Sequence, residues 1–189
     1  MSMLELLAAL TGALAVWLST REHVWSWPVA LVNVGLYTVV FYEAKLYADM
    51  GLQVVYFALS LYGWYEWLYG GADRSTLHVS RVGARLAAWL AIIGVAFALL
   101  LGTILRRYTD AALPGLDSAL TSGSLVAQFM MTRKLIEHWM IWIAVDVVYV
   151  GMFIFKALHV TAVLYAAFLG LAVLGHIRWR RSLAESRAA

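Results

Sequence analysis

Seven apolar runs, separated by polar gaps, follow one another along the chain. A helix that crosses a bilayer needs roughly 17–25 residues, and every run but the fifth reaches that length; the fifth is expected to extend into its flanks. Only 13% of the residues are charged, whereas a soluble domain has about a quarter. The pattern predicts an all-α polytopic membrane protein with seven transmembrane helices, at about residues 3–19, 25–42, 49–67, 86–105, 118–132, 138–155 and 160–177.

Basic residues in the gaps predict the orientation of these helices. Taking the gaps alternately, one side of the membrane holds only Lys45, Arg106, Arg107 and Lys156, and the other holds the remaining ten. Because basic residues concentrate in cytoplasmic loops, we expect the N-terminus outside and the C-terminus, with a basic tail over 179–189, in the cytoplasm. The basic residues form no contiguous face, which argues against nucleic-acid binding. The absence of cysteine excludes disulfides and thiolate metal sites.

The chain also contains an internal repeat. When the chain is slid against itself, one register holds across three apolar runs, aligning Thr20-Arg21 with Thr132-Arg133, Trp27 with Trp139, Tyr37 with Tyr149, Phe41 with Phe153, Gly63 with Gly175, and Trp67 with Trp179. This repeat register predicts two three-helix repeats, 3–67 and 118–178, joined by a linker helix at 86–105. One linker helix leaves both repeats with the same orientation in the membrane, an arrangement typical of one class of transporters. A duplicated scaffold is the alternative.

One face of the sixth predicted helix carries an acid among aromatic rings. Trp139, Trp142, Asp146 and Tyr149 are spaced so that they share a helical face. A carboxylate in the middle of an apolar helix is expensive and needs a reason. Indole and phenol rings with a carboxylate suit a flat organic cation, through stacking and cation–π attraction. Alternatively, Asp146 is protonated or bonded to a polar group on a neighbouring helix.

Polar residues in three other predicted helices are further candidates for substrate binding. Asn33 and Tyr37 lie near the middle of the second helix, although Asn33 could equally join helices to one another. Gln53, on a stripe with Tyr56 and Ser60, is the strongest candidate in the third helix, and Gln128 lies in the fifth. Trp64 and Trp67 are expected in the interfacial belt.

Two kinds of site are not predicted. The five histidines show no metal-ligand spacing, and there is no nucleotide-binding motif. We therefore expect no metal, no cofactor and no enzymatic activity.

The segments VNVGLYTVVFYEAKLYADMGLQ and LYGWYEW in the first half, and AQFMMTRKLIEHWMIWIAVDVVYV, Tyr165 and Arg178-Trp179 in the second, resemble the PnuC family of bacterial vitamin transporters. The resemblance covers almost the entire chain. It implies a 3+1+3 fold, a homo-oligomer in the bacterial inner membrane, and facilitated diffusion of nicotinamide riboside made one-way by phosphorylation inside the cell. The substrate-binding residues that it implies are Asn33, Tyr37, Gln53, Gln128, Trp139, Trp142, Asp146, Tyr149 and Tyr165.

The residues and the resemblance together favour uptake of nicotinamide riboside, a flat pyridinium cation with a sugar. Thiamine is also a flat cation and is the alternative. Riboflavin is neutral, so Asp146 counts against it. A membrane-embedded vitamin sensor, which binds the cation without moving it, is the alternative from another class.

Overall fold

Residues 3–43, 47–109, 113–155 and 159–188 are described by the computed structural model, and almost all of them are helical. One short 3-10 turn (η1, Ala72–Arg74) follows the third helix. The seven α-helices of the described chain are α1 (Met3–Thr20), α2 (Ser26–Glu43), α3 (Tyr47–Tyr69), α4 (Ala84–Tyr108), α5 (Pro114–Thr132), α6 (His138–Phe155) and α7 (His159–Ala188). The predicted fold class is confirmed.

Helices α5 and α7 extend beyond their apolar runs. As expected, α5 extends into its N-terminal flank, where Pro114 begins the helix at a position whose missing N–H removes no bond. Helix α7 continues to Ala188, well beyond the predicted end at 177, so most of the predicted basic tail is helical. Charged residues end an apolar run, but they do not end a helix, because its backbone bonds are local.

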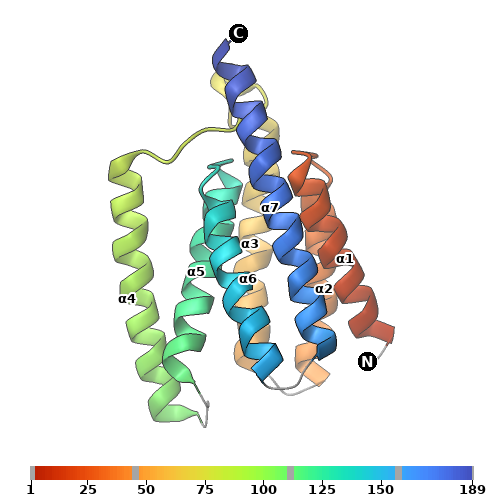
Figure 1. The fold of residues 1–189 in the computed structure, drawn as a ribbon, viewed down its shortest axis with the longest axis vertical. Coiled ribbons are helices and arrows are strands. Elements are labelled where there is room, and N and C mark those ends of the chain that lie inside the picture. Colours follow the sequence, from red (N-terminus) through yellow and green to blue (C-terminus); the bar gives the residue numbers. More distant parts are fainter. Residues whose placement is uncertain (1–2, 44–46, 110–112, 156–158, 189) are drawn as a thin grey trace.

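Apolarity and length by themselves identify fewer spans than the sequence pattern predicted. Among the described residues, only Ala84–Tyr108, His138–Phe155 and Thr161–Ser186 are long and apolar enough to cross a membrane on those criteria, and Leu6–Thr20 is a shorter apolar helix. The remaining helices run alongside these in the same bundle (Figure 1). Their lower apolarity reflects polar side chains such as Gln53 and Gln128, which face the interior rather than lipid.

The packing of the helices follows the predicted repeat. Helix α2 lies between α1 and α3, just as α6 lies with α5 and α7, while α4 packs on α5 at the side of the bundle (Figure 1). Corresponding helices run in the same direction, so the repeats are parallel. The third helix of each repeat packs on the first helix of the other: α3 on α5, and α7 on α1.

Each repeat is held together by a tryptophan ring seated on a glycine. The ring of Trp27 in α2 lies against Gly63 in α3, and the ring of Trp139 in α6 lies against Gly175 in α7. A Cβ at either glycine would overlap with the ring. Both tryptophans are almost wholly buried. The absent side chain is therefore what lets each pair of helices approach closely, as small residues do in membrane bundles.

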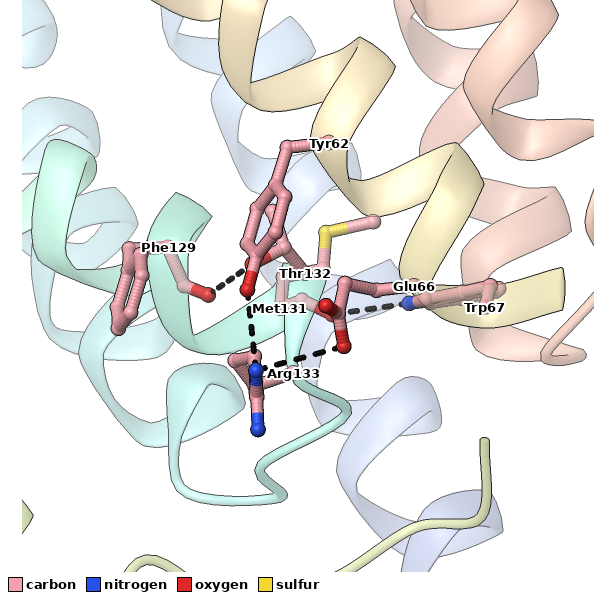
Figure 2. Close-up of polar contacts among 7 residues, drawn as sticks. All are labelled: Tyr62, Glu66, Trp67, Phe129, Met131, Thr132 and Arg133. Carbon is pink, nitrogen blue, oxygen red and sulfur yellow. Dashed lines mark hydrogen bonds and ion pairs between the residues drawn. The ribbon is translucent and has the colours of Figure 1, made fainter. Parts of the chain in front are cut away.

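Two further tryptophans bind one repeat to the other. The indole N–H of Trp67 donates to the carbonyl oxygen of Met131 at 3.0 Å (Figure 2), and that of Trp179 donates to the carbonyl oxygen of Ser19 at 2.9 Å. Ser19 and Met131 occupy matching positions in the repeat register, so these are equivalent bonds. The prediction that Trp67 belongs to the interfacial belt is wrong, since only 3% of it is exposed.

The contact between α3 and α5 also contains an ion pair at the surface. The Arg133 guanidinium donates to the Tyr62 hydroxyl at 3.0 Å and lies 3.4 Å from the Glu66 carboxylate (Figure 2). The bond to Tyr62, together with the nearby Glu66, raises the pKa of Arg133 further, so the group stays charged. Because this pair is partly solvated, it adds little to stability.

The connection from α3 to α4 forms a strap, residues 75–83, across one end of the bundle (Figure 1). Its Ser80 pairs with the α5–α6 turn, donating to the Lys134 carbonyl and accepting from the Ile136 N–H, each at 3.0 Å. The Glu137 carboxylate accepts the N–H of Val82 at 3.0 Å. The strap thereby covers the end of the bundle at which α1, α3 and α5 finish.

We predict that Gly63→Ala and Gly175→Ala each lower the free energy of unfolding by about 1–3 kcal/mol, since the added methyl must displace a buried indole. The measurement is thermal unfolding of the purified protein in detergent. Gly51→Ala in α3 and Gly170→Ala in α7 are matched controls, because nothing lies within 4 Å of a Cβ there. Equal melting temperatures in all four variants would contradict the seating of the rings.

Candidate substrate cavity

A cavity of about 420 Å³ lies between the two repeats. Its lining comes from α1, α2 and α3 of the first repeat and from α5, α6 and α7 of the second. Helix α4 contributes none of the lining residues. The cavity is enclosed by the six duplicated helices, which is where a pair of parallel repeats places a substrate path.

Eight of the nine residues predicted to bind substrate line this cavity. They are Asn33, Tyr37, Gln53, Gln128, Trp139, Trp142, Asp146 and Tyr165, which come from five helices. The ninth, Tyr149, is not among the lining residues. Its ring instead packs on the ring of Tyr165, with centroids 4.8 Å apart. Tyr149 is therefore placed to support a cavity wall.

Asp146 is the acid of the cavity. Asp146 is 6% exposed and lies one helical turn after Trp142 in α6. Trp139 and Trp142 also line the cavity. Within the described chain, no hydrogen bond or ion pair to the Asp146 carboxylate is found. The alternative that Asp146 is bonded to a neighbouring helix finds no support there. A carboxylate held this way is available to a ligand.

Asn33 joins two helices. Its amide nitrogen donates to the Ala8 carbonyl at 2.6 Å and to the Thr11 hydroxyl at 3.2 Å, both in α1. The nitrogen also lies 3.2 Å from where a Cβ on Gly12 would be, so the glycine makes room for it. Both amide hydrogens of Asn33 are thus bonded within the first repeat. These two bonds join α2 to α1, as the helix-joining interpretation predicted.

Several lining residues were not among the predicted site residues. Most of them belong to α1, α2 and α3, notably Ser19, Ser26, Trp27, Tyr56 and Ser60. The repeat register carried a usable signal, because it pairs Trp27 with the predicted Trp139. Tyr56 and Ser60 lie on the same stripe of α3 as Gln53. Ser19 and Ser26 carry no comparable signal in the sequence.

The charge of the cavity is distinctive. Among the lining residues that the structure describes, Asp146 is the only acidic one, and there is no lysine, arginine or histidine. Aromatic and amide side chains supply the remaining ligand-binding groups. Such a cavity can stabilise a flat monocation, but it has no cation with which to bind a phosphate.

Two parallel three-helix repeats around a central cavity, with a linker helix at the side, define a membrane transporter of the 3+1+3 type. The chain belongs to the nicotinamide mononucleotide transporter family, whose model matches residues 2–181. It is a transporter rather than an enzyme, as predicted.

Curated relatives and a solved structure agree with this assignment. The nicotinamide riboside transporter PnuC of Escherichia coli is 26% identical over 210 residues, covering 98% of this chain and 88% of that protein. The riboflavin/roseoflavin transporter RibM of Streptomyces davaonensis is 28% identical, covering 97% and 87%. The crystal structure of the vitamin B3 transporter PnuC superimposes with a TM-score of 0.76 at 24% identity, covering 97% and 83%, which supports the fold.

We predict that Asn33→Ala lowers the free energy of unfolding by about 1 kcal/mol, the usual value of an interhelical hydrogen bond in a membrane protein. Thr11→Val, which removes one acceptor of the Asn33 amide outside the cavity lining, should lower stability less and leave ligand affinity unchanged. Thermal unfolding and calorimetric binding measure the two effects. An Asn33→Ala variant of unchanged stability and weakened binding would show that the side chain serves the ligand instead.

Proposed function

We propose that this protein takes up nicotinamide riboside through the bacterial cytoplasmic membrane by facilitated diffusion. The observation that carries the proposal is the Asp146 carboxylate, which has no partner among the described residues and lies in the same cavity as the indoles of Trp139 and Trp142. The names of two relatives, from Escherichia coli and Neisseria mucosa, support the same substrate. The Neisseria protein is 28% identical, covering 95% of this chain and 73% of that protein.

The arrangement of polar groups fits the two parts of the molecule. The pyridinium ring, a flat cation, would lie against the indoles with Asp146 as its counter-charge. Gln53 and Gln128 each offer a donor and an acceptor, which suit ribose hydroxyls and the carboxamide. Asn33 is less suited to this role, because its amide hydrogens are bonded to α1.

The charge of the cavity favours the riboside over its phosphate ester. The family description names nicotinamide mononucleotide, which carries a phosphate, but the described part of the lining has no basic side chain to bind one. A phosphate brought beside Asp146 would also meet a like charge. Phosphorylation inside the cell would therefore trap the vitamin, because the product is a poor ligand for the same cavity.

Two other vitamins are weaker candidates. Thiamine also carries a flat cationic ring, and Asp146 would serve it in the same way. Riboflavin is the named substrate of the Streptomyces davaonensis relative. Its ring system is neutral, so it gains nothing from Asp146, and leaving a buried acid beside a neutral ligand is unfavourable.

The proposal includes an orientation and an assembly. The ten basic residues on the side where α1, α3 and α5 end favour that side as cytoplasmic, which leaves the N-terminus outside. The family resemblance implies a homo-oligomer. A sensor would bind the same cation without moving it, so flux is the property that separates the two classes.

We predict that purified protein in liposomes equilibrates radiolabelled nicotinamide riboside across the membrane without an ion gradient. Nicotinamide mononucleotide should neither enter nor compete, since no base lines the cavity among the described residues. Efflux, influx and competition by thiamine and riboflavin are measured in the same vesicles. Binding of the riboside without flux would point to a sensor, and competition by thiamine alone would transfer the proposal to that vitamin.

We predict that Asp146→Asn weakens binding of the riboside by about 1–3 kcal/mol, the scale of a partly desolvated charge contact, or roughly tenfold to hundredfold. Asp117→Asn removes an equal charge from an exposed position in the first turn of α5 and should leave affinity unchanged. Calorimetry on both variants makes the comparison. Equal affinities would remove Asp146 from the binding site.

A further inference from the structure

The cavity is closed at the end covered by the strap. Trp27 and Trp139 line it, whereas Trp67 and Trp179 lie beyond them, buried, and do not. The four rings are in continuous contact, with centroids 5.3 Å apart for Trp27 and Trp67, 5.9 Å for Trp67 and Trp179, and 5.6 Å for Trp139 and Trp179. We call these four residues the tryptophan plug. Two of its rings come from each repeat, and Val79 of the strap belongs to the same buried cluster.

An ion pair joins the two repeats at this same end. The Lys134 ammonium lies 3.1 Å from the Glu22 carboxylate, and the Lys134 side chain is 8% exposed. The ammonium also lies 4.6 Å from the centre of the Trp67 ring, so it is held over the plug. The pair is thus largely withdrawn from water. Removing one partner there would leave a buried charge without compensation, which is strongly destabilising.

Glu22 and Lys134 occupy matching positions in the repeat register. Both lie in the turns between the first and second helices of their repeats, and both have positive φ angles, 55° and 48°. Two equivalent side chains that contact each other must lie on the axis relating the repeats. Any movement that separates the repeats at this end must separate these two charges.

Two of the four indole N–H groups of the plug, and one hydroxyl beside it, lack a hydrogen-bond partner in the described chain. They are the buried indole N–H groups of Trp27 and Trp139 and the Ser26 hydroxyl. A buried donor without an acceptor is unfavourable, because it has lost its bond to water. Water entering from this end would satisfy these groups, so they favour opening, and the ion pair opposes it.

We propose that the Glu22–Lys134 pair is the latch of a gate, which keeps the cavity shut at this end and separates when the cavity opens there. This inference rests on the proposed transport function, because a carrier must open its site to each side in turn. The other ion pair of the described chain, Arg133–Glu66, lies off the axis and has a half-exposed arginine. It has no counterpart in the other half, where Arg21 and Arg178 occupy the equivalent positions.

The natural absence of cysteine allows a direct test by thiol accessibility. Ser26→Cys places a reporter in the buried lining beside the plug. A membrane-impermeant maleimide is then applied to vesicles from the strap side, with no vitamin present. Glu22→Gln and Lys134→Met should each raise the labelling rate about tenfold or more, since each leaves one charge uncompensated in the closed state. The exchanged pair, Glu22→Lys with Lys134→Glu, should return the rate towards that of the reporter alone.

Arg133→Gln is the matched control, because it breaks the half-exposed pair at the same end and should change labelling little. Equal labelling in all single variants, or an exchanged pair as accessible as the single variants, would overturn the latch. A labelling rate that Arg133→Gln raises as much as the latch variants do would also overturn the latch, because it would indicate only a loosened bundle.

A second measurement covers the case in which a single variant folds poorly. Glu22→Cys with Lys134→Cys, joined by a short bis-methanethiosulfonate reagent, should stop flux in liposomes, and a reducing agent should restore it. Flux that continues with the positions joined would overturn the latch. If the labelling rates change as expected but the protein transports no nicotinamide riboside, the gate is supported and only the proposed substrate is overturned.

Discussion

The seating of an indole ring in the space of a missing side chain, made once in each repeat, is the contact on which the rest of this structure depends. Because Gly63 and Gly175 have no Cβ, the rings of Trp27 and Trp139 pack directly against the third helix of each repeat. This fixes how the second and third helices cross. Trp67 and Trp179, one turn beyond the glycines, are then positioned to reach the other repeat and bind its carbonyl oxygens. Packing within each repeat thereby sets the packing between them.

The framework is duplicated, but the walls of the cavity are not. Trp27 and Trp139 are the one pair of equivalent lining residues that are identical. In the first two helices of the repeats, three pairs have the aliphatic member in the first repeat and the polar or aromatic member in the second: Val16 with Gln128, Ala30 with Trp142, and Val34 with Asp146. Ser19 with Met131 is the exception. In the third helices the first repeat has the more polar member, as Gln53 with Tyr165, Tyr56 with Phe168, and Ser60 with Ala172.

These differences gather the polar groups on one side. Helix α5 packs on both α3 and α6, so Gln53, Gln128 and Asp146 come from three adjacent helices. The wall formed by α7 and α1, which pack on each other, is more apolar. A symmetric bundle thus encloses an asymmetric site, as an asymmetric ligand with a ring at one end and a sugar at the other requires.

Much of this was predictable from the sequence because it depends on patterns that lipid imposes. Apolar runs located the helices, since every backbone polar group in a bilayer must be bonded within its own helix. The repeat identified the two bundles, and the cost of polar groups in lipid identified Gln53, Gln128 and Asp146 as cavity residues. Other features depend on contacts between distant residues. An amphipathic ring near a helix end suits the membrane interface and the core equally, so the sequence placed Trp67 wrongly. The bonds of Asn33 to α1 and the packing of Tyr149 on Tyr165 depend on which helices are neighbours, which the sequence pattern does not show.

The described residues of the cavity lining include no basic side chain, which bears on how net uptake could occur without an energy source. A carrier that binds its solute equally on both sides only equilibrates it. If the solute gains a phosphate after entry, a cavity with one acid and no base favours the incoming cation and rejects the outgoing anion, so return through the same path is blocked. Directionality would then come from the charge of the product rather than from a coupled ion. On this argument Asp146 serves twice, as the counter-charge that admits the vitamin and as the like charge that repels its phosphate ester.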